Sequence, residues 1–156
     1  MAAVNSEQYG TGAVIPGTGS STMTLYGTYT GAGALSAADT INMFTMPAGF
    51  TPLIGWLVGG DADTGVETLE LDVGIAGDAT KFLNSGVITG DTGSPDEKIT
   101  VGVRLPLQED LMTVKPTELT ADTDLIVTVT AAAATGASVP ITVVMQGLFK
   151  DPRVVA

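Results

Sequence analysis

The sequence contains no cysteine and no histidine. Without cysteine there can be no disulfide and no thiolate metal site. Without histidine, the chain lacks the commonest general base and the commonest transition-metal ligand. Aromatic residues make up only 5% of the chain, which leaves little surface on which a sugar could stack. Enzymes are therefore the weakest functional class for this sequence, and we expect no catalytic residue and no cofactor.

Charge, and positive charge above all, is also scarce. Charged residues are 15% of the 156 residues, against about 25% in an ordinary globular domain. The 17 acidic and 6 basic residues give a net charge of -11, which repels nucleic-acid phosphates and anionic lipids. We therefore expect neither nucleic acid nor a membrane as a direct partner.

Long apolar runs are absent as well. No stretch approaches the roughly 18 consecutive apolar residues of a transmembrane helix. The first residues show neither the basic start nor the apolar run of a signal peptide. These absences predict a soluble protein that is made in a cytoplasm.

Glycine and threonine are abundant, with 20 and 23 residues. Threonine fits the pleated surface of a sheet and glycine supplies turn angles, so the composition favours strands and tight turns. Hydrophobic residues make up 44% of the chain, and the mean hydropathy is +0.35. A monomer with so few charges must expose a largely uncharged surface, and large apolar patches usually mark interfaces. We therefore expect a subunit of an assembly.

Eight short apolar or alternating segments, separated by turn-forming residues, predict strands. They cover residues 22–30, 40–46, 53–58, 67–75, 98–105, 111–114, 124–131 and 141–149, with a weaker ninth at 86–89. Helical periodicity is nearly absent, and one short helix is predicted near residues 78–84, where Asp78 could cap the first turn. The pattern predicts an all-β fold, an antiparallel β-sandwich or jelly roll of about eight strands. It would form a single domain over residues 22–156, preceded by a flexible N-terminal arm over residues 1–21.

Acidic residues gather around the fourth predicted strand. Asp61, Asp63 and Glu67 loosely resemble a calcium-binding loop, in which several oxygens converge from a tight turn. The turn glycine sits one place early, however, and the alternation that begins at Leu69 demands extended structure where the loop should continue. We predict solvated, outward side chains here, with a calcium site at Asp61, Asp63 and Glu67 as the weaker alternative.

Two further carboxylates, Glu70 and Asp72, lie on one side of the same strand. Glycoside hydrolysis uses such a pair roughly 5 to 10 Å apart, but one member must be partly buried to raise its pKa. We interpret the pair as part of the outward row of a half-buried strand. Trp56 lies in an apolar strand and is predicted to be core. The same prediction, or a place in a subunit interface, applies to Met43, Met46 and Met145.

The order of several motifs resembles that of small structural proteins of tailed bacteriophages. The motifs are "LYGTYT", "DTINMFTMPAGFTPLIGWLV", "ETLELDVGIAGDATKFLNSG", "DTDLIVTVTA" and "PITVVMQGLF", and the similarity covers roughly residues 22–149. The matching residues are Pro47, Gly49, Leu71, Asp72, Val73, Gly74, Asp78, Lys81, Phe82, Leu83 and Asp122. The resemblance implies a jelly-roll-like head decoration (cement) protein, typically a homotrimer that clamps the major capsid protein on the capsid exterior, with no catalytic residues.

In such a protein, the N-terminal arm would tie the subunit to the coat protein or to a neighbouring protomer through Val4, Tyr9, Val14 and Ile15. Another virion part, such as a head-fibre base or a tail accessory protein, is the alternative within the same class. A lectin-like module that binds carbohydrate, with calcium at the acidic turn, is the alternative from a different class.

Overall fold

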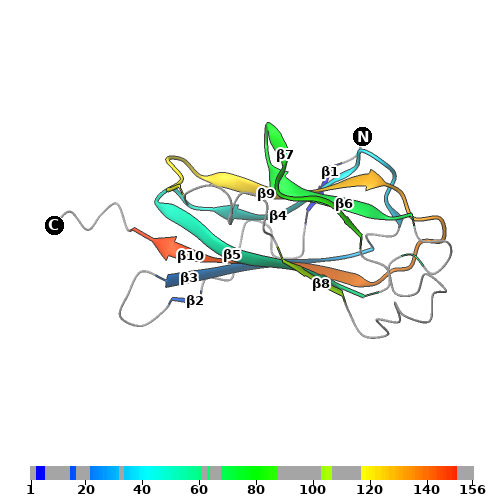
Figure 1. Cartoon of the computed structure of the whole chain (residues 1–156), viewed down its shortest axis with the longest axis horizontal. Coiled ribbons are helices and arrows are strands. Elements are labelled where there is room, and N and C mark those ends of the chain that lie inside the picture. The colour runs from blue at the N-terminus through cyan, green and yellow to red at the C-terminus, as the bar shows by residue number, and fades with distance from the viewer. Residues whose placement is uncertain are drawn as a thin grey trace.

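The computed structural model describes residues 3–5, 15–16, 22–31, 34–60, 63, 68–87, 103–106 and 117–150, with the backbone alone for 15–16, 85–87 and 103–106. The described residues form two facing sheets (Figure 1). The strands are β1 (Ala3–Asn5), β2 (Ile15–Pro16), β3 (Thr22–Thr30), β4 (Thr40–Met46), β5 (Phe50–Gly59), β6 (Glu70–Ile75), β7 (Asp78–Val87), β8 (Val103–Pro106), β9 (Thr123–Ala131) and β10 (Pro140–Phe149). No helix in this described part is long and apolar enough to cross a membrane.

The strand order is that of a jelly roll. Sheet A has the order β1-β4-β9-β6-β7, and sheet B has the order β2-β3-β10-β5-β8. All neighbouring strands pair antiparallel except β1, which pairs parallel with β4. Without β1 and β2, each sheet has four strands, and the chain repeatedly crosses from one sheet to the other, as in two Greek keys. The predicted β-sandwich or jelly roll is confirmed.

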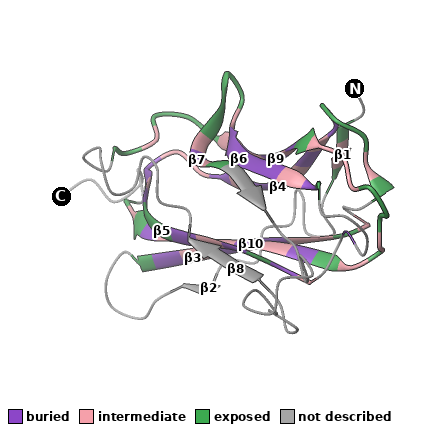
Figure 2. Cartoon of the chain, turned by 45° about the vertical axis from the view of Figure 1, so that its right-hand side comes forward, coloured by how far each residue is buried: buried purple, intermediate pink, exposed green. Residues whose placement is uncertain are grey.

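The core lies between the sheets and is built by alternate residues of each strand. In β3, Met23 and Leu25 are buried, while Thr24 between them is partly exposed. Figure 2 shows the buried residues along the strands of both sheets. The methionines predicted as core or interface are buried in the core, and the largest buried side chains include Phe44, Phe50 and Phe82. Alternation predicted this part of the structure because its period matches that of a strand.

The two sheets approach closely at Gly27. A Cβ atom at this position would overlap the carbonyl oxygen of Met43 in the facing sheet and would lie 3.2 Å from the ring of Phe44. Glycine is therefore required by the close approach of two backbones.

The short helix predicted near residues 78–84 is wrong, because these residues belong to strand β7. Ile75 pairs with Asp78 across a two-residue turn, in which Gly77 has a φ of 84°. This left-handed conformation favours glycine and reverses the chain, so Asp78 begins a strand instead of capping a helix. The register between β6 and β7 shifts twice, and the tip of the hairpin stands away from the sheet (Figure 1). Phe82 still reaches the core.

Most of the other predicted strands are confirmed. The segments 22–30 and 40–46 coincide with β3 and β4, and 53–58 lies inside β5. The segments 124–131 and 141–149 match β9 and β10 to within one residue. The predicted strand at 111–114 lies outside the described residues.

Candidate functional site

Asp63 lies in the connection that leads from β5 to β6 along the chain. Its side chain is buried, with 1% of the residue's surface exposed. Its carboxylate accepts hydrogen bonds from backbone N–H groups of two loops: from Thr68 (2.8 Å) and Leu69 (3.3 Å), and from Ala134 (3.0 Å) and Thr135 (2.9 Å). Burial raises the pKa of Asp63, but these four donors outweigh it and lower the pKa to about 2. The side chain therefore links the loop before β6 to the loop after β9 through hydrogen bonds.

This geometry bears on the predicted calcium site. Both carboxylate oxygens of Asp63 already accept N–H groups, so they face donors instead of an open space for a cation. Asp61 and Glu67 lie outside the described residues. In the part of the chain that the structure describes, no group of three or more His, Cys, Asp or Glu residues could hold a metal ion. The calcium site stays a prediction without structural support.

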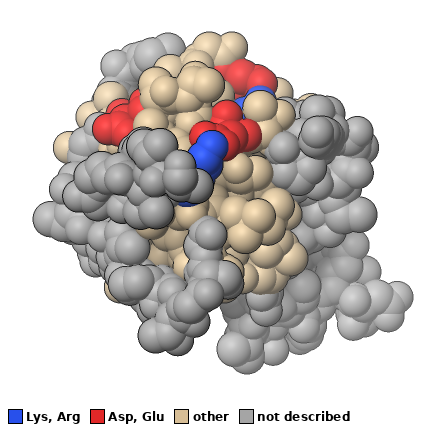
Figure 3. Space-filling view, turned by 90° about the vertical axis from the view of Figure 1, so that its left-hand side faces the viewer, with Lys and Arg blue, Asp and Glu red and all other residues tan. Residues whose placement is uncertain are grey.

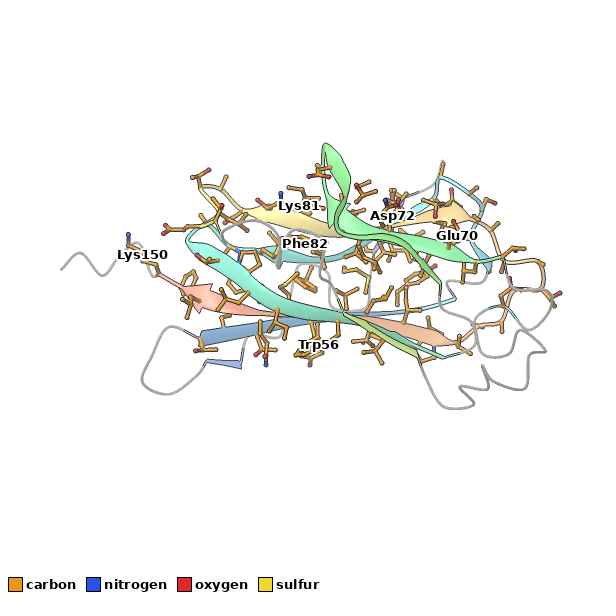
Figure 4. The ribbon with its side chains drawn as sticks, viewed as in Figure 1. Trp56, Glu70, Asp72, Lys81, Phe82 and Lys150 are labelled. Atoms are coloured by element: carbon orange, nitrogen blue, oxygen red, sulfur yellow. The ribbon has the colours of Figure 1, made fainter. Side chains whose placement is uncertain are left out.

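The carboxylates of β6 lie on the side of sheet A that faces away from sheet B. Figure 4 shows Glu70, Asp72 and Lys81 on this side and Phe82 between the sheets. Glu70 is half-buried, as predicted for an outward row, but Asp72 is buried, at 6% exposed. The prediction of solvated side chains is therefore wrong for Asp63 and for Asp72.

Among the described residues, charge is unequally distributed between the two outer faces. Seen from one end of the sandwich, the Asp, Glu and Lys atoms of these residues gather in the upper half, where sheet A lies (Figure 3). On β7, Lys81 and Asp78 form an exposed ion pair of 3.7 Å. By contrast, strands β3, β5 and β10 of sheet B contain no Asp, Glu, Lys or Arg.

The outer face of sheet B, as described for β3, β5 and β10, is a mixture of apolar side chains and threonines. Trp56 is half-buried on this face and lies outside the core cluster, so its prediction as core is wrong (Figure 4). Strand β5, which contains Trp56, is apolar on both sides, and such a pattern does not tell which side faces the core. Sequence reasoning missed this face, although the lack of charge in three strands was visible.

A shallow hollow of about 410 Å³ lies on the outer face of sheet A. It is lined by the tip of the β6–β7 hairpin, residues 75–79, and by Thr40 of β4 and Ile126 and Thr128 of β9. Most of these side chains are small or apolar, and nothing in the hollow converges as a catalytic or metal-binding group would.

Residues from two of the motifs that resemble phage structural proteins lie together at one end of the sandwich. The chain turns between β4 and β5 at Pro47, whose carbonyl accepts a hydrogen bond from the N–H of Phe50 (3.1 Å). The carboxylate of Asp122 accepts the N–H of Ala48 in the same turn (2.9 Å). The motif residues Pro47 and Asp122 are therefore structural: they hold a turn.

The predicted partner-binding residues of the N-terminal arm are only partly described. Val4 lies in β1, which pairs with residues Thr40–Asn42 of β4, and its side chain packs against the core of its own sandwich. Ile15 lies in β2, which pairs with β3. Tyr9 and Val14 lie outside the described residues. Two pieces of the arm thus add a strand to each sheet, and their contact with a partner stays a prediction.

Comparison with known proteins gives matches at the level of structure. No family model and no curated protein matches the sequence. A chain of the cyanophage Pam1 capsid asymmetric unit matches with a TM-score of 0.66 at 23% identity, over 87% of this chain and 90% of that one. A chain of the capsid of Ralstonia phage GP4 matches with a TM-score of 0.65 at 22% identity, over 96% of this chain and 99% of that one.

This chain has the fold of phage capsid chains. A third match, to the acidic stable capsid structure of Helicobacter pylori bacteriophage KHP30, has a TM-score of 0.54 at 11% identity over 85% of this chain. The resemblance to phage structural proteins is thus confirmed at the level of the fold.

Proposed function

We propose that this chain is a structural virion protein that decorates the outside of a phage capsid as a homotrimer and stabilises it. The likeness of nearly the whole chain to chains of two phage capsid structures is the observation that carries this proposal. Its partners would be other copies of itself and the major capsid protein. It would be made in the host cytoplasm and would act on the capsid exterior, without catalysis.

The mechanism follows from binding equilibria. A protein that binds the mature lattice but not the disassembled coat protein shifts the equilibrium towards the assembled shell. An oligomer that contacts several coat subunits at once gains further from multivalency, because the later contacts form at a high effective concentration. Each contact can then be modest, and the stabilisation is spread over many copies.

Co-sedimentation of the purified protein with empty shells of the coat protein from the same phage tests the proposal. We expect saturable binding and a higher temperature of shell disruption. Failure to bind shells would contradict the decoration role. Binding to fibres or tails alone would favour another virion part, and calcium-dependent retention on a polysaccharide column would favour the lectin-like module.

The role of the arm is tested in the same assay by deleting residues 1–20. Because β1 pairs with β4 and Val4 packs on the core, the deletion is also expected to lower the melting temperature. The matched control is Ile41→Val, which lowers the stability of the core but leaves the predicted contact residues of the arm unchanged. Unchanged shell binding by a folded deletion variant would contradict the predicted contact of the arm with the coat protein.

A further inference from the structure

The outer face of sheet B is uncharged on a chain that is strongly acidic. We define this face by the outward side chains of β3, β5 and β10, the three inner strands of the sheet. None of the three strands contains a charged residue, whereas the chain carries a net charge of -11. The edge strand β8 places Arg104 at the register position next to Val58, so a basic residue occurs at the border of the face.

The large exposed apolar residues of the described chain all belong to this sheet. Leu53, Ile54 and Val58 of β5 are 40%, 45% and 36% exposed, and Leu148 of β10 is 47% exposed. Depletion of charge together with exposed apolar side chains is typical of the centre of a protein–protein interface.

Two aromatic residues lie near the middle of the same face. Val144 pairs with Tyr26 of β3 on one side and with Trp56 of β5 on the other, so the three form one row across the sheet. Each of them is half-buried. Tyrosine and tryptophan are the residues most often found as binding hot spots, where they lie close to the centre of an interface.

Two pairs of polar side chains on this face bond to each other. The hydroxyl oxygens of Thr28 and Thr142 lie 2.9 Å apart, and Gln146 donates its Nε2 hydrogen to Thr24 Oγ1 at 3.1 Å. A polar group that already has a partner costs less to remove from water than one that has none. The arrangement therefore suits burial against a protein, and it leaves fewer hydroxyl and amide groups to receive a sugar.

The face can supply about half of a standard interface. Its three strands have nine or ten residues each; about 4.8 Å apart and about 30 Å long, they cover roughly 430 Å² of sheet. A standard interface buries about 800 Å² on each partner. The whole face would have to be covered, together with residues around it.

From these observations we propose that the outer face of sheet B packs against a second copy of this chain. Two copies with a charge of -11 each repel one another, and contact through a surface without acidic groups adds least to that repulsion. The proposal rests on the proposed function, since it names the surface through which the copies of the decorating oligomer meet. Self-association is nevertheless measured without capsids, so this inference and the proposed decoration role can fail separately.

The test introduces a charge on the exposed face and measures mass by light scattering. Ile54→Glu and Leu148→Glu change side chains that are nearly half exposed, so the variants are expected to fold. We expect the wild type at a multiple of 15.8 kDa and both variants shifted to 15.8 kDa. The matched control is Thr130→Glu on an exposed position of β9 in sheet A, which should leave the oligomer intact.

Trp56 gives a second readout that needs no variant, because it is the single tryptophan of the chain. Its fluorescence should become less accessible to acrylamide as the protein concentration rises through the association range. Quenching that does not depend on concentration in an oligomeric sample would overturn the proposal.

Other outcomes identify a different occupant of the face. A wild type that stays monomeric at all concentrations overturns the proposal. If the monomer then binds shells and Leu148→Glu abolishes that binding, the coat protein covers the face. If the monomer protects Trp56 and the variants bind shells normally, another segment of the same chain covers it. An oligomer that loses mass in the variants but does not bind shells would keep this inference and contradict the decoration role.

Discussion

The negative charge of Asp63 is held in a buried position by backbone N–H groups of two loops. Its folded pKa of about 2 lies below the ordinary value of 3.8, so the folded state binds this proton less readily than the unfolded state. The stabilisation by hydrogen bonds to the ionised carboxylate is therefore present above pH 3.8, and it is lost as the pH falls towards 2. The difference corresponds to about 2 kcal/mol of folding free energy.

Asp63→Asn should lower the free energy of unfolding by about 2 to 3 kcal/mol at pH 7, because an amide group would face N–H donors with a donor of its own. Urea unfolding measures this change. The matched control is Asp78→Asn, which removes an exposed ion pair and should cost less than about 1 kcal/mol. In the wild type, stability should fall between about pH 4 and pH 2 by about 2 kcal/mol more than in the Asp63→Asn variant. Equal pH profiles would contradict the assigned role.

The role of this side chain could not be predicted from the sequence. Neighbouring residues place Asp63 before a strand, where an acid is usually solvated. Half of its donors come from Ala134 and Thr135, which follow β9 much later in the chain. Periodicity describes residues within one element and carries no information about such distant partners.

The β6–β7 hairpin shows what periodicity can and cannot predict for an element. Alternation identified β3, β4, β9 and β10, because one side of each strand faces the core and the other faces outward. At Asp78 the same reasoning failed, since an acidic residue followed by apolar residues suits both a capped helix and a strand. Gly77 decided the outcome, and its φ of 84° is a property of the folded chain. The order of strands in the two sheets was not predicted, because the pattern of segments suits both a simpler β-sandwich and a jelly roll.

Gly77→Val should destabilise the protein, because a β-branched residue is strained at a φ of 84°. Gly77→Asn is the matched variant, since asparagine tolerates this conformation better. No heavy atom lies within 4 Å of the position where a Cβ would be placed, so neither variant clashes. Thermal unfolding should show a cost of about 1 to 3 kcal/mol for valine and clearly less for asparagine. A similar loss of stability in both variants would mean that the left-handed conformation of residue 77 does not decide which residue is tolerated there.

For the molecule as a whole, the lack of charged residues in β3, β5 and β10 of a strongly acidic chain sets how the proposed self-association should respond to the solvent. Acidic side chains of neighbouring copies repel one another even when an uncharged face is buried between the copies. Salt shortens the range of this repulsion, from about 10 Å at 0.1 M to about 3 Å at 1 M. Salt also strengthens the burial of apolar surface when the anion is sulfate.

The proposed oligomer should therefore dissociate less readily at high salt, the reverse of an assembly held by ion pairs. Light scattering on serial dilutions in about 0.05 M and about 0.5 M sodium chloride measures the dissociation constant. Addition of calcium or of a chelator at constant ionic strength should leave the mass unchanged, because the oxygens of Asp63 already accept N–H groups. A calcium-dependent mass would instead favour the binding-module alternative, and weaker association at high salt would contradict an uncharged interface.

The strand order has a consequence for how the protein is made. In sheet B, β10 lies between β3 and β5, and in sheet A, β9 lies between β4 and β6. A ribosome delivers the outer strands first and the central strand of each sheet late, so early strands wait without their main hydrogen-bonding neighbour. Apolar strands in that state are prone to aggregate. Cells that synthesise this chain in quantity should therefore depend on chaperones that hold nascent strands until β9 and β10 emerge.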